Sequence, residues 1–149
     1  MNNENKIIIY QVFTRLFGNN NNHCVYNGDI VTNGCGKMAD FTLKALSEIK
    51  KLGTTHIWYT GIIEHATQTD YRRYNISPDH PAIVKGKAGS PYAIKDYYDV
   101  DPDLANDIPE RMREFENLVR RTHRAGLKVI IDFVPNHVAR QYHSDAQPD

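Results

Sequence analysis

The chain has 149 residues, which is enough for one compact domain with a buried core. Its 18 Lys and Arg side chains balance its 18 Asp and Glu side chains, so charge gives no argument for nucleic acid or an anionic membrane as a partner. No apolar run is long enough to span a bilayer. The polar start lacks the pattern of a secretory signal, so we expect a cytoplasmic protein unless a signal has been removed.

Two cysteines, Cys24 and Cys35, stand in one segment rich in Asn and Gly. Two are too few for a disulfide framework, and no metal-ligand spacing accompanies them. We expect free thiols, although the two could form a disulfide if the protein is exported.

Three short runs rich in β-branched and aromatic residues predict strands. They cover residues 6–13 (KIIIYQVF), 54–60 (TTHIWYT) and 128–134 (KVIIDFV). The first is too short for a typical helix, and Pro135 closes the third. After Lys128, the third run is apolar except for Asp132.

Two amphipathic segments predict helices. The first covers residues 41–52, with Asp40 as its cap and Phe41, Ala45, Ile49 and Leu52 on one face. The second covers residues 108–125. Its start, Asp107–Glu110, has an Asp followed three residues later by a Glu, which is typical of a capping box.

Residues 61–106 show no sustained periodicity and are rich in Tyr, Asp, Gly and Pro. A connection this long inside a domain is usually functional or disordered, and its many tyrosines favour order. The chain therefore runs strand, helix, strand, long loop, helix, strand. This alternation predicts an α/β fold with a parallel sheet and right-handed crossovers.

Polar groups gather where the third strand ends. Ligands of parallel α/β folds bind at the carboxyl ends of strands, and Asp132, Asn136 and His137 stand there. An acid, an amide and an imidazole could bind hydroxyl groups or a metal ion. The spacing alone also allows a structural interpretation: Asp132 orients a neighbouring loop, Asn136 makes an Asx turn and His137 is an ordinary surface histidine.

The long loop contains Tyr92, Asp96, the pair Tyr97–Tyr98, and Asp101–Pro102. Sugars stack on aromatic faces and bond to nearby carboxylates and amides, so this composition suits a polar ligand. The alternative is that the tyrosines pack the loop onto the domain, and for Tyr97 and Tyr98 we favour that alternative.

Other features predict no site. The remaining histidines show no metal-ligand spacing and receive no role. The segment 86–90 (GKAGS) lacks the flanking strand, the flanking helix and the spacing of a phosphate loop.

Four stretches, in order, resemble the α-amylase family of glycoside hydrolases. They are Tyr10-Gln-Val-Phe13 with Phe17, Leu52–Trp58, Tyr92 with Asp96–Pro102, and Ile131-Asp-Phe-Val-Pro-Asn-His137. The last resembles the family's first signature region, an Asp followed four residues later by Asn-His at the end of the third barrel strand. The chain is therefore expected to be the N-terminal part of a (β/α)8 barrel, with strands one to three, helices one and two, and a long loop after strand two.

The resemblance also implies roles. Asp132 would support the sugar site through hydrogen bonds, His137 would bind hydroxyls of the sugar at the cleavage point, and Tyr92 would stack under that sugar. Asn136 would be a calcium ligand in members that bind the ion, so the expected partners are an α-glucan and calcium. Calcium needs six to eight oxygens, so Asn136 alone cannot form the site.

The family's carboxylate nucleophile and general acid come from strands beyond the third, and no pair here matches their motifs. This chain alone is therefore expected to be inactive, and its open barrel edges favour self-association. Two departures, Ser90–Pro91 where the family has His-Gly and Gly61 where it often has Pro, bear on substrate preference.

Two other functions compete with a hydrolase. The first is a non-catalytic carbohydrate-binding or assembly protein, as some family members are partners of membrane transporters. The second is a nucleotide-binding domain, which the lack of a Gly-rich turn after the first strand disfavours.

Overall fold

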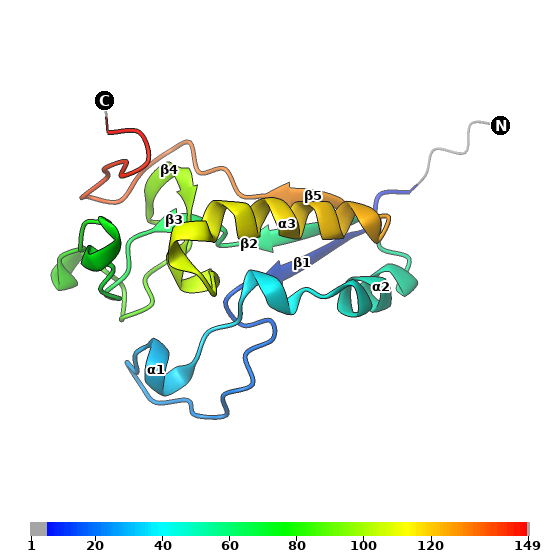
Figure 1. Cartoon of the computed structure of the whole chain (residues 1–149), viewed down its shortest axis with the longest axis horizontal. Helices are drawn as coiled ribbons and strands as arrows, with labels where there is room; N and C mark the ends of the chain where they lie inside the picture. The colour runs from blue at the N-terminus through cyan, green and yellow to red at the C-terminus, as the bar shows by residue number, and fades with distance from the viewer. Residues whose placement is uncertain (1–5, 149) are drawn as a thin grey trace.

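The computed structural model describes residues 6–148 of the chain. Strands β1 (Ile9–Phe13), β2 (His56–Thr60) and β5 (Lys128–Ile131) form one sheet in the order β1-β2-β5 (Figure 1). Both pairings are parallel, as the sequence predicted. Parallel neighbours require crossover connections, and the segments with the two long helices provide them.

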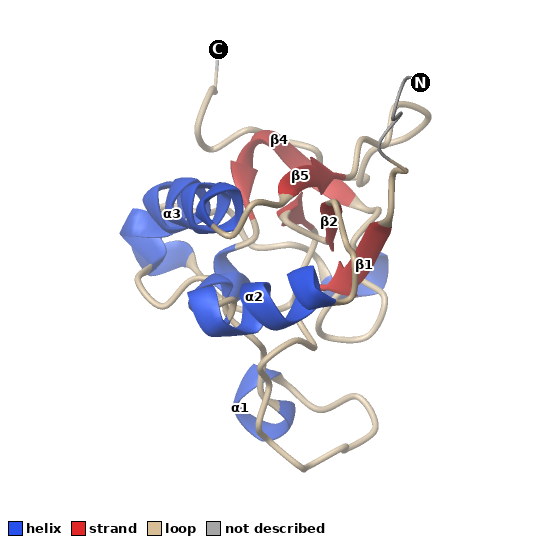
Figure 2. Ribbon diagram, turned by 90° about the vertical axis from the view of Figure 1, so that its right-hand side faces the viewer, coloured by secondary structure: helices blue, strands red, loops and turns tan. Residues whose placement is uncertain are grey.

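Helices α2 (Leu43–Lys51) and α3 (Arg111–Arg124) lie together on one face of this sheet (Figure 2). A short helix, α1 (Ile30–Asn33), lies in a separate lobe formed by the loop after β1 (Figure 1). Short 3-10 turns complete the helical structure at Met38–Asp40, Arg72–Tyr74, Pro81–Ile83, Pro102–Leu104 and Ile108–Glu110. Within residues 6–148, no helix combines the length and apolar character that a bilayer crossing needs.

The main core lies between the sheet and these two helices. Phe41 is at its centre, stacked on Phe17 with ring centroids 4.1 Å apart and edge-on to Tyr59 at 4.9 Å. Its buried members come from every layer: Val12, Met38, Phe41, Leu46, Ile49, Ile57, Tyr59, Ile62, Val100, Leu104, Ala105, Leu118 and Leu127. Burial of this set gives the parallel sheet one covered face.

The long segment 61–106 contains structure that the sequence did not predict. Strands β3 (Ile63–His65) and β4 (Ile94–Val100) pair antiparallel in a second, two-stranded sheet, with register shifts on both sides of Glu64. The expectation of an ordered segment is confirmed, but its strands escaped prediction because buried charged residues, including Lys95, Asp96 and Asp99, interrupt the apolar pattern.

The predicted start of the first helix was wrong. Thr42, not Asp40, caps α2, and its hydroxyl accepts a hydrogen bond from Ala45 N at 3.2 Å. Asp40 instead accepts from Lys37 N at 2.6 Å and closes a 3-10 turn. The reason lies in Phe41, because burying its ring in the core turns the chain before the helix can begin.

The far end of the first helix also differs from the prediction. Leu52, expected on the buried face, is 68% exposed, whereas Leu46 is fully buried. Leu52 lies after the last helical residue, Lys51, where the chain turns into Gly53 with φ +84°. The helical spacing that would place Leu52 over the core therefore no longer applies.

The capping box predicted for the second helix does not form. Residues Ile108–Glu110 make a 3-10 turn, α3 starts at Arg111, and the Asp107 side chain caps nothing. Glu114 replaces it: its carboxylate accepts from Asn106 N and Asp107 N at 2.8–3.1 Å. The capping box predicted Glu110 as the acidic side chain at the start of the helix. The acceptor observed for the backbone N–H groups of residues 106 and 107 is Glu114, one helical turn later.

The predicted strands are longer than those observed. The third was expected to continue to residue 134, but β5 ends at Ile131. Its partner β2 ends at Thr60, one residue beyond the partner of Ile131, and Gly61 then turns away with φ +79°, so β2 offers almost nothing for the chain after Ile131 to pair with. The start of the first strand, predicted at residue 6, is likewise delayed to Ile9.

The sheet face opposite the helices is open. Ile9 and Phe13 on this face are 50% and 37% exposed, and β1 and β5 form the two edges of the sheet. Parallel sheets usually have both faces covered. The described chain is thus a three-stranded arc with one helical layer, and the barrel is not closed.

Candidate functional site

The carboxyl edge of the parallel sheet carries a hydrogen-bonded polar group. Trp58 Nε1 donates to Asp132 Oδ1 at 3.0 Å, and Gly61 N donates to Asp132 Oδ2 at 3.3 Å. On the neighbouring strand, Gln11 Nε2 donates to Thr60 Oγ1 at 2.9 Å. Thr60 and Asp132 are thereby held at the ends of their strands, where ligands of parallel α/β folds bind.

Gly61 brings the long loop to this edge. A Cβ at this position would lie 3.1 Å from Pro91 Cβ and 3.2 Å from Phe13 Cε2, so the loop before Tyr92 packs closely against the end of β1. Tyr92 is 42% exposed. The structure therefore gathers Asp132 and the segment of Tyr92 around one glycine, and glycine suits the position because of both its positive φ and the close contacts.

Asn136 and His137 form a pair of their own. His137 Nδ1 and Asn136 Oδ1 are 2.7 Å apart, and both side chains are exposed. Among the described residues, no hydrogen bond or ion pair joins either side chain to Asp132 or Tyr92. Of the four residues predicted for the site, Asp132 contacts Gly61 directly and Tyr92 follows Pro91, which lies next to Gly61, whereas Asn136 and His137 contact each other on an exposed segment.

Tyr97 anchors that exposed segment. Its hydroxyl donates to Val134 O, and its ring lies 5.9 Å from Phe133 and 6.1 Å from Tyr142, measured between centroids. The packing role favoured for Tyr97 is confirmed. Tyr98, in contrast, is 63% exposed, so the same expectation was wrong for it.

A buried polar cluster lies beneath the loop ends. The Asp103 carboxylate accepts from Arg15 and, at 2.6 Å, from the Tyr71 hydroxyl. His65 Nδ1 lies 3.6 Å from Asp101 Oδ2, and both side chains are almost fully buried. Burial raises the pKa of Asp101 to about 6, with the nearby His65 opposing that shift. His65, which the sequence left without a role, is part of this internal network.

A second buried cluster lies between β3 and β4. Lys95 Nζ is 3.6 Å from Glu64 Oε1 and 3.4 Å from Asp79 Oδ2. Asp99 accepts two hydrogen bonds of 2.9 Å from Arg111 Nε. Burial raises the pKa of Glu64 to about 8, Lys95 opposes the shift, and the neighbouring Asp99 and Asp96 add to it.

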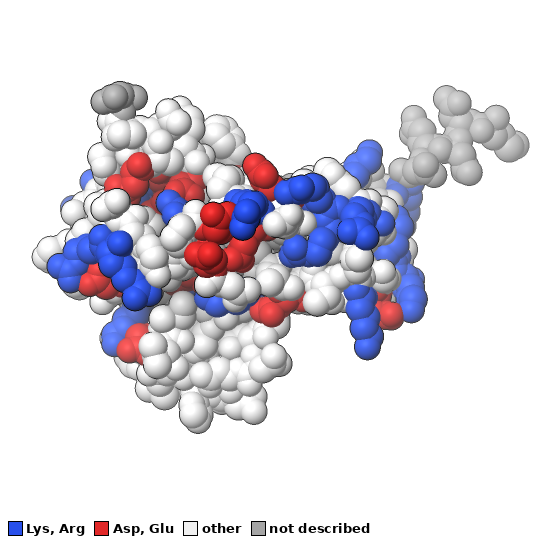
Figure 3. All heavy atoms as spheres, viewed as in Figure 1, with Lys and Arg blue, Asp and Glu red and all other residues white. Residues whose placement is uncertain are grey.

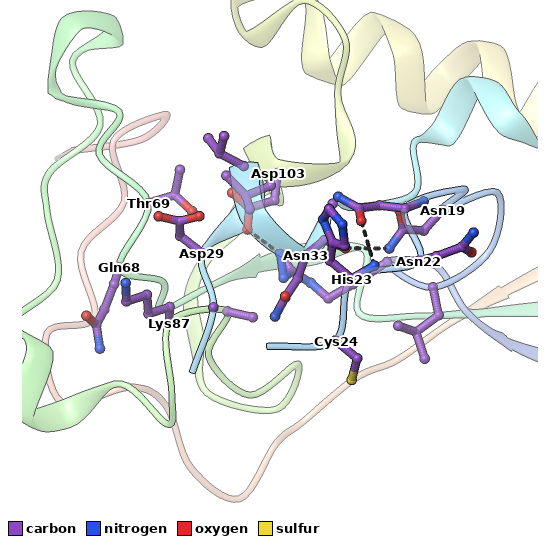
Figure 4. A pocket seen from close by; sticks show the side chains of 18 of the residues that line it. Asn19, Asn22, His23, Cys24, Asp29, Asn33, Gln68, Thr69, Lys87 and Asp103 are labelled. Carbon is purple, nitrogen blue, oxygen red and sulfur yellow. Dashed lines mark hydrogen bonds and ion pairs between the residues drawn. The ribbon is translucent and has the colours of Figure 1, made fainter. Parts of the chain in front are cut away.

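A cavity of about 580 Å³ opens beside the lobe of α1. Figure 4 shows Gln68, Thr69 and Lys87 on one side of it and Asn19, Asn22 and His23 on the other. None of the four predicted site residues lines it. The lobe that bears it shows few charged side chains, whereas Lys and Arg gather near the C-terminal end of α3 (Figure 3).

Sequence analysis missed the partners of Asp132. Trp58 and Gly61 are 74 and 71 residues away from it in the chain, and no local pattern joins them. The strand pairing brings them together, because β2 and β5 are parallel neighbours that end side by side, with Tyr59 opposite Ile131. Only a prediction of which strands pair, and in which register, could have identified these partners. The two cysteines are free thiols, with Cys24 exposed and Cys35 half-buried.

Comparison with known proteins relates this architecture to one family. The family model described as the alpha amylase catalytic domain matches residues 11–147. Alpha-amylase 2 of Dictyoglomus thermophilum is 28% identical over 132 residues, which cover 89% of this chain and 19% of that protein. The amino acid transporter heavy chain SLC3A1 of Rattus norvegicus is 43% identical over 51 residues, or 34% of this chain and 7% of that protein.

A solved structure gives the same result. A maltogenic alpha-amylase, AmyB from Thermotoga neapolitana, superposes with a TM-score of 0.58 and 29% identity over 95% of this chain and 26% of that one. The chain thus spans about a quarter or less of the length of these relatives. Because the family model matches almost the whole chain, the protein belongs to the α-amylase family of glycoside hydrolases, of whose catalytic domain it carries three parallel strands.

Proposed function

We propose that the protein to which this chain belongs hydrolyses α-linked glucans with retention of configuration, and that the chain supplies part of the sugar-binding side of its active site. The observation that carries the proposal is the anchoring of Asp132 by Trp58 Nε1 and Gly61 N at the carboxyl edge of the parallel sheet. Active sites of (β/α)8 enzymes lie at this edge.

The chain's own residues would bind and orient the sugar. Tyr92 presents a partly exposed ring for stacking, next to the sheet edge. Asp132 has both oxygens engaged by fixed donors, so its carboxylate is held in place to accept or position hydroxyl groups. His137 is exposed and paired with Asn136, which orients the imidazole.

Retaining hydrolysis needs a nucleophilic carboxylate and a carboxylic acid about 5 Å apart across the scissile bond. Asp132 lacks such a partner, because its described contacts are an indole and a backbone N–H. We therefore propose that the 149-residue chain by itself is catalytically inactive and that the reacting carboxylates come from further barrel strands.

Asn136 is the residue that would hold calcium. Its amide oxygen is a suitable hard ligand, but it is paired with His137 Nδ1 at 2.7 Å. An ion there would have to displace this contact and take most of its oxygens from other segments. Calcium at Asn136 therefore remains a proposal for the complete barrel.

A reducing-sugar assay on a protein that contains this chain within a complete barrel tests the hydrolase proposal. We expect release of reducing ends from an α-glucan, and a large loss of kcat/KM on Asp132→Ala. Tyr92→Ala should chiefly raise KM, whereas Tyr98→Ala, also exposed, serves as the matched control. A folded barrel that cleaves no α-glucan would refute the proposal.

A non-catalytic assembly role is the second candidate. The observation that favours it is the 43% identity to the transporter heavy chain over 51 residues. Under this alternative, the folded full barrel would show no glucan cleavage and would instead co-purify with a membrane protein. Glucan binding by the chain itself, lost on Tyr92→Ala and kept on Tyr98→Ala, would instead favour a carbohydrate-binding protein.

We also propose that the isolated chain self-associates through the edges of its sheet. Strands β1 and β5 have one unpaired side each, and Ile9, Ile131 and Phe133 are 41–74% exposed there. Light scattering should show a mass that rises with concentration, and Ile131→Lys should reduce it. A chain that stays monomeric at all concentrations would contradict this proposal.

A further inference from the structure

Glu64, Asp96 and Asp99 bring three carboxylates together in the interior. One oxygen from each lies within 4.8 Å of the other two, and the three residues are 0–5% exposed. The strand pairing explains the meeting, since Glu64 on β3 stands opposite Asp96 on β4, and Asp99 follows on the same strand. Carboxylates of equal charge repel one another, so such a group needs compensation.

The spacing fits one ion. Calcium binds oxygens at about 2.3–2.6 Å, so two oxygens on one calcium are at most about 5 Å apart. Magnesium binds at about 2.0–2.1 Å, which limits the same separation to about 4 Å. The limit of 4.8 Å that these three oxygens satisfy lies within the range that one calcium ion allows and extends beyond the range of magnesium.

One oxygen of the Glu64 carboxylate lacks a hydrogen-bond partner among the described residues. Among the described residues, Glu64 Oε2 is buried without any hydrogen bond, although Lys95 lies near the other oxygen of the same carboxylate. An unpaired buried carboxylate oxygen is costly, and such atoms are rare in native structures. This atom belongs to a side chain that is 1% exposed and forms part of the three-carboxylate group, so a bound cation would supply what it lacks.

The charged side chains around the group carry an excess of negative charge. Four buried carboxylates, those of the group and Asp79, face the buried Lys95 and the partly buried Arg111, whose side chain is 15% exposed. Lys95 lies between Glu64 and Asp79, while Arg111 is paired with Asp99. When all four acids are ionised, the balance is two negative charges in excess, which a divalent cation would neutralise.

The other ligands of the ion can be named in part. Asp96 Oδ2 accepts from Ser144 Oγ, Asp145 N and Ala146 N, whereas its Oδ1 accepts from Tyr98 N alone. A carboxylate oxygen has two lone pairs, so Oδ1 keeps one for a cation. Calcium commonly completes its shell with waters and with a second oxygen of a carboxylate.

From these observations we propose that Glu64, Asp96 and Asp99 form a calcium site between β3 and β4. This site is separate from Asn136, which lies on another segment and is not a member of the group. Its occupant would fasten the two-stranded sheet to the segment after β5, because Asp96 also binds the backbone of residues 145 and 146. The site would therefore stabilise the loop that bears Tyr92.

Calcium titration of the chelator-treated 149-residue chain, followed by calorimetry and thermal unfolding, tests the proposal. We expect calcium to bind and to raise Tm, with a weaker effect of magnesium. Glu64→Gln keeps the shape of the side chain and removes its charge, and it should lower the calcium affinity at least tenfold. Glu48→Gln changes an exposed carboxylate and should leave the affinity unchanged.

Asn136→Ala separates the two calcium positions. Affinity retained in Asn136→Ala and lost in Glu64→Gln supports the site between β3 and β4. Loss in Asn136→Ala with retention in Glu64→Gln would overturn it, as would the absence of calcium binding to the original chain, which would mean that Glu64 holds a proton instead. If circular dichroism shows Glu64→Gln to be unfolded, Asp99→Asn replaces it, and terbium luminescence displaced by calcium provides the readout.

Discussion

Trp58 Nε1 donates a hydrogen bond of 3.0 Å to Asp132 Oδ1 and so joins the second strand of the parallel sheet to the segment that follows the third. Trp58 is the single tryptophan of the chain. The contact therefore has a spectroscopic reporter of its own, and the geometry of the proposed sugar site can be followed without a substrate.

Replacing Asp132 by Ala should change the emission of Trp58 and lower the free energy of unfolding by about 1–3 kcal/mol, because the indole N–H and Gly61 N lose a charged acceptor. Intrinsic fluorescence and urea unfolding measure the two effects. Asp132→Asn can still accept the hydrogen bond from Trp58, so its stability and its emission should lie between those of the original chain and those of Asp132→Ala. Unaltered emission in Asp132→Ala would show that this contact is absent in solution.

The two interpretations of Asp132 in the sequence prove to be compatible. A carboxylate that interrupts an apolar strand predicted a polar contact, and the observed contact to Gly61 N does orient the neighbouring loop. The identity of the partners could not be predicted, because Trp58 and Gly61 become neighbours only through the pairing of β2 with β5. Sequence periodicity locates a strand but does not say which strand end lies beside it.

Breaking the pair of Arg15 and Asp103 should be costly. Asp103→Ala leaves Arg15 with its side chain only 14% exposed and removes the acceptor of the Tyr71 hydroxyl. Loss of one partner of a buried pair lowers stability by about 3–5 kcal/mol, which urea unfolding measures. The matched control is Asp70→Ala, which breaks an exposed pair with Arg72 and should leave stability unchanged. Equal effects of both variants would argue against burial as the cause.

Local patterns predicted the existence of the helices better than their ends. Both α2 and α3 form where apolar spacing indicated them, but Asp40 and Asp107 do not cap them. The competing demand is tertiary: Phe41 is drawn into the core, and Glu114 reaches back to the backbone of residues 106 and 107. These contacts depend on how distant parts of the chain pack together. A sequence pattern of a few residues therefore cannot predict which residue caps the helix.

The two thiols should react at very different rates. Burial raises the pKa of Cys35 to about 11, so only about one Cys35 in a thousand is a thiolate near pH 8. Cys24 is exposed. Mass spectrometry after brief treatment with iodoacetamide should find one modification, at Cys24, and Cys24→Ser should abolish it. Rapid modification of Cys35 in the folded chain would show that its surroundings open readily.

The hydroxyl of Tyr59 sets a limit on stability at high pH. Thr122 Oγ1 donates to Leu118 O at 2.8 Å, so its single proton is used and Tyr59 is the donor in their contact of 2.6 Å. Burial raises the pKa of Tyr59 to about 12. The neutral form is thus favoured in the folded chain, and the unfolded chain releases this proton first.

Stability should consequently fall as pH rises from about 10, where an unfolded tyrosine ionises, to about 12, where Tyr59 ionises in the folded chain. The loss attributable to this group is about 2–3 kcal/mol, and the contribution is fully present below pH 10. Tyr59→Phe should cost about 1 kcal/mol at neutral pH because Thr122 Oγ1 loses a donor. Urea unfolding across this range should show a shallower decline in Tyr59→Phe than in the original chain, and parallel declines would mean that the Tyr59 hydroxyl is accessible to water.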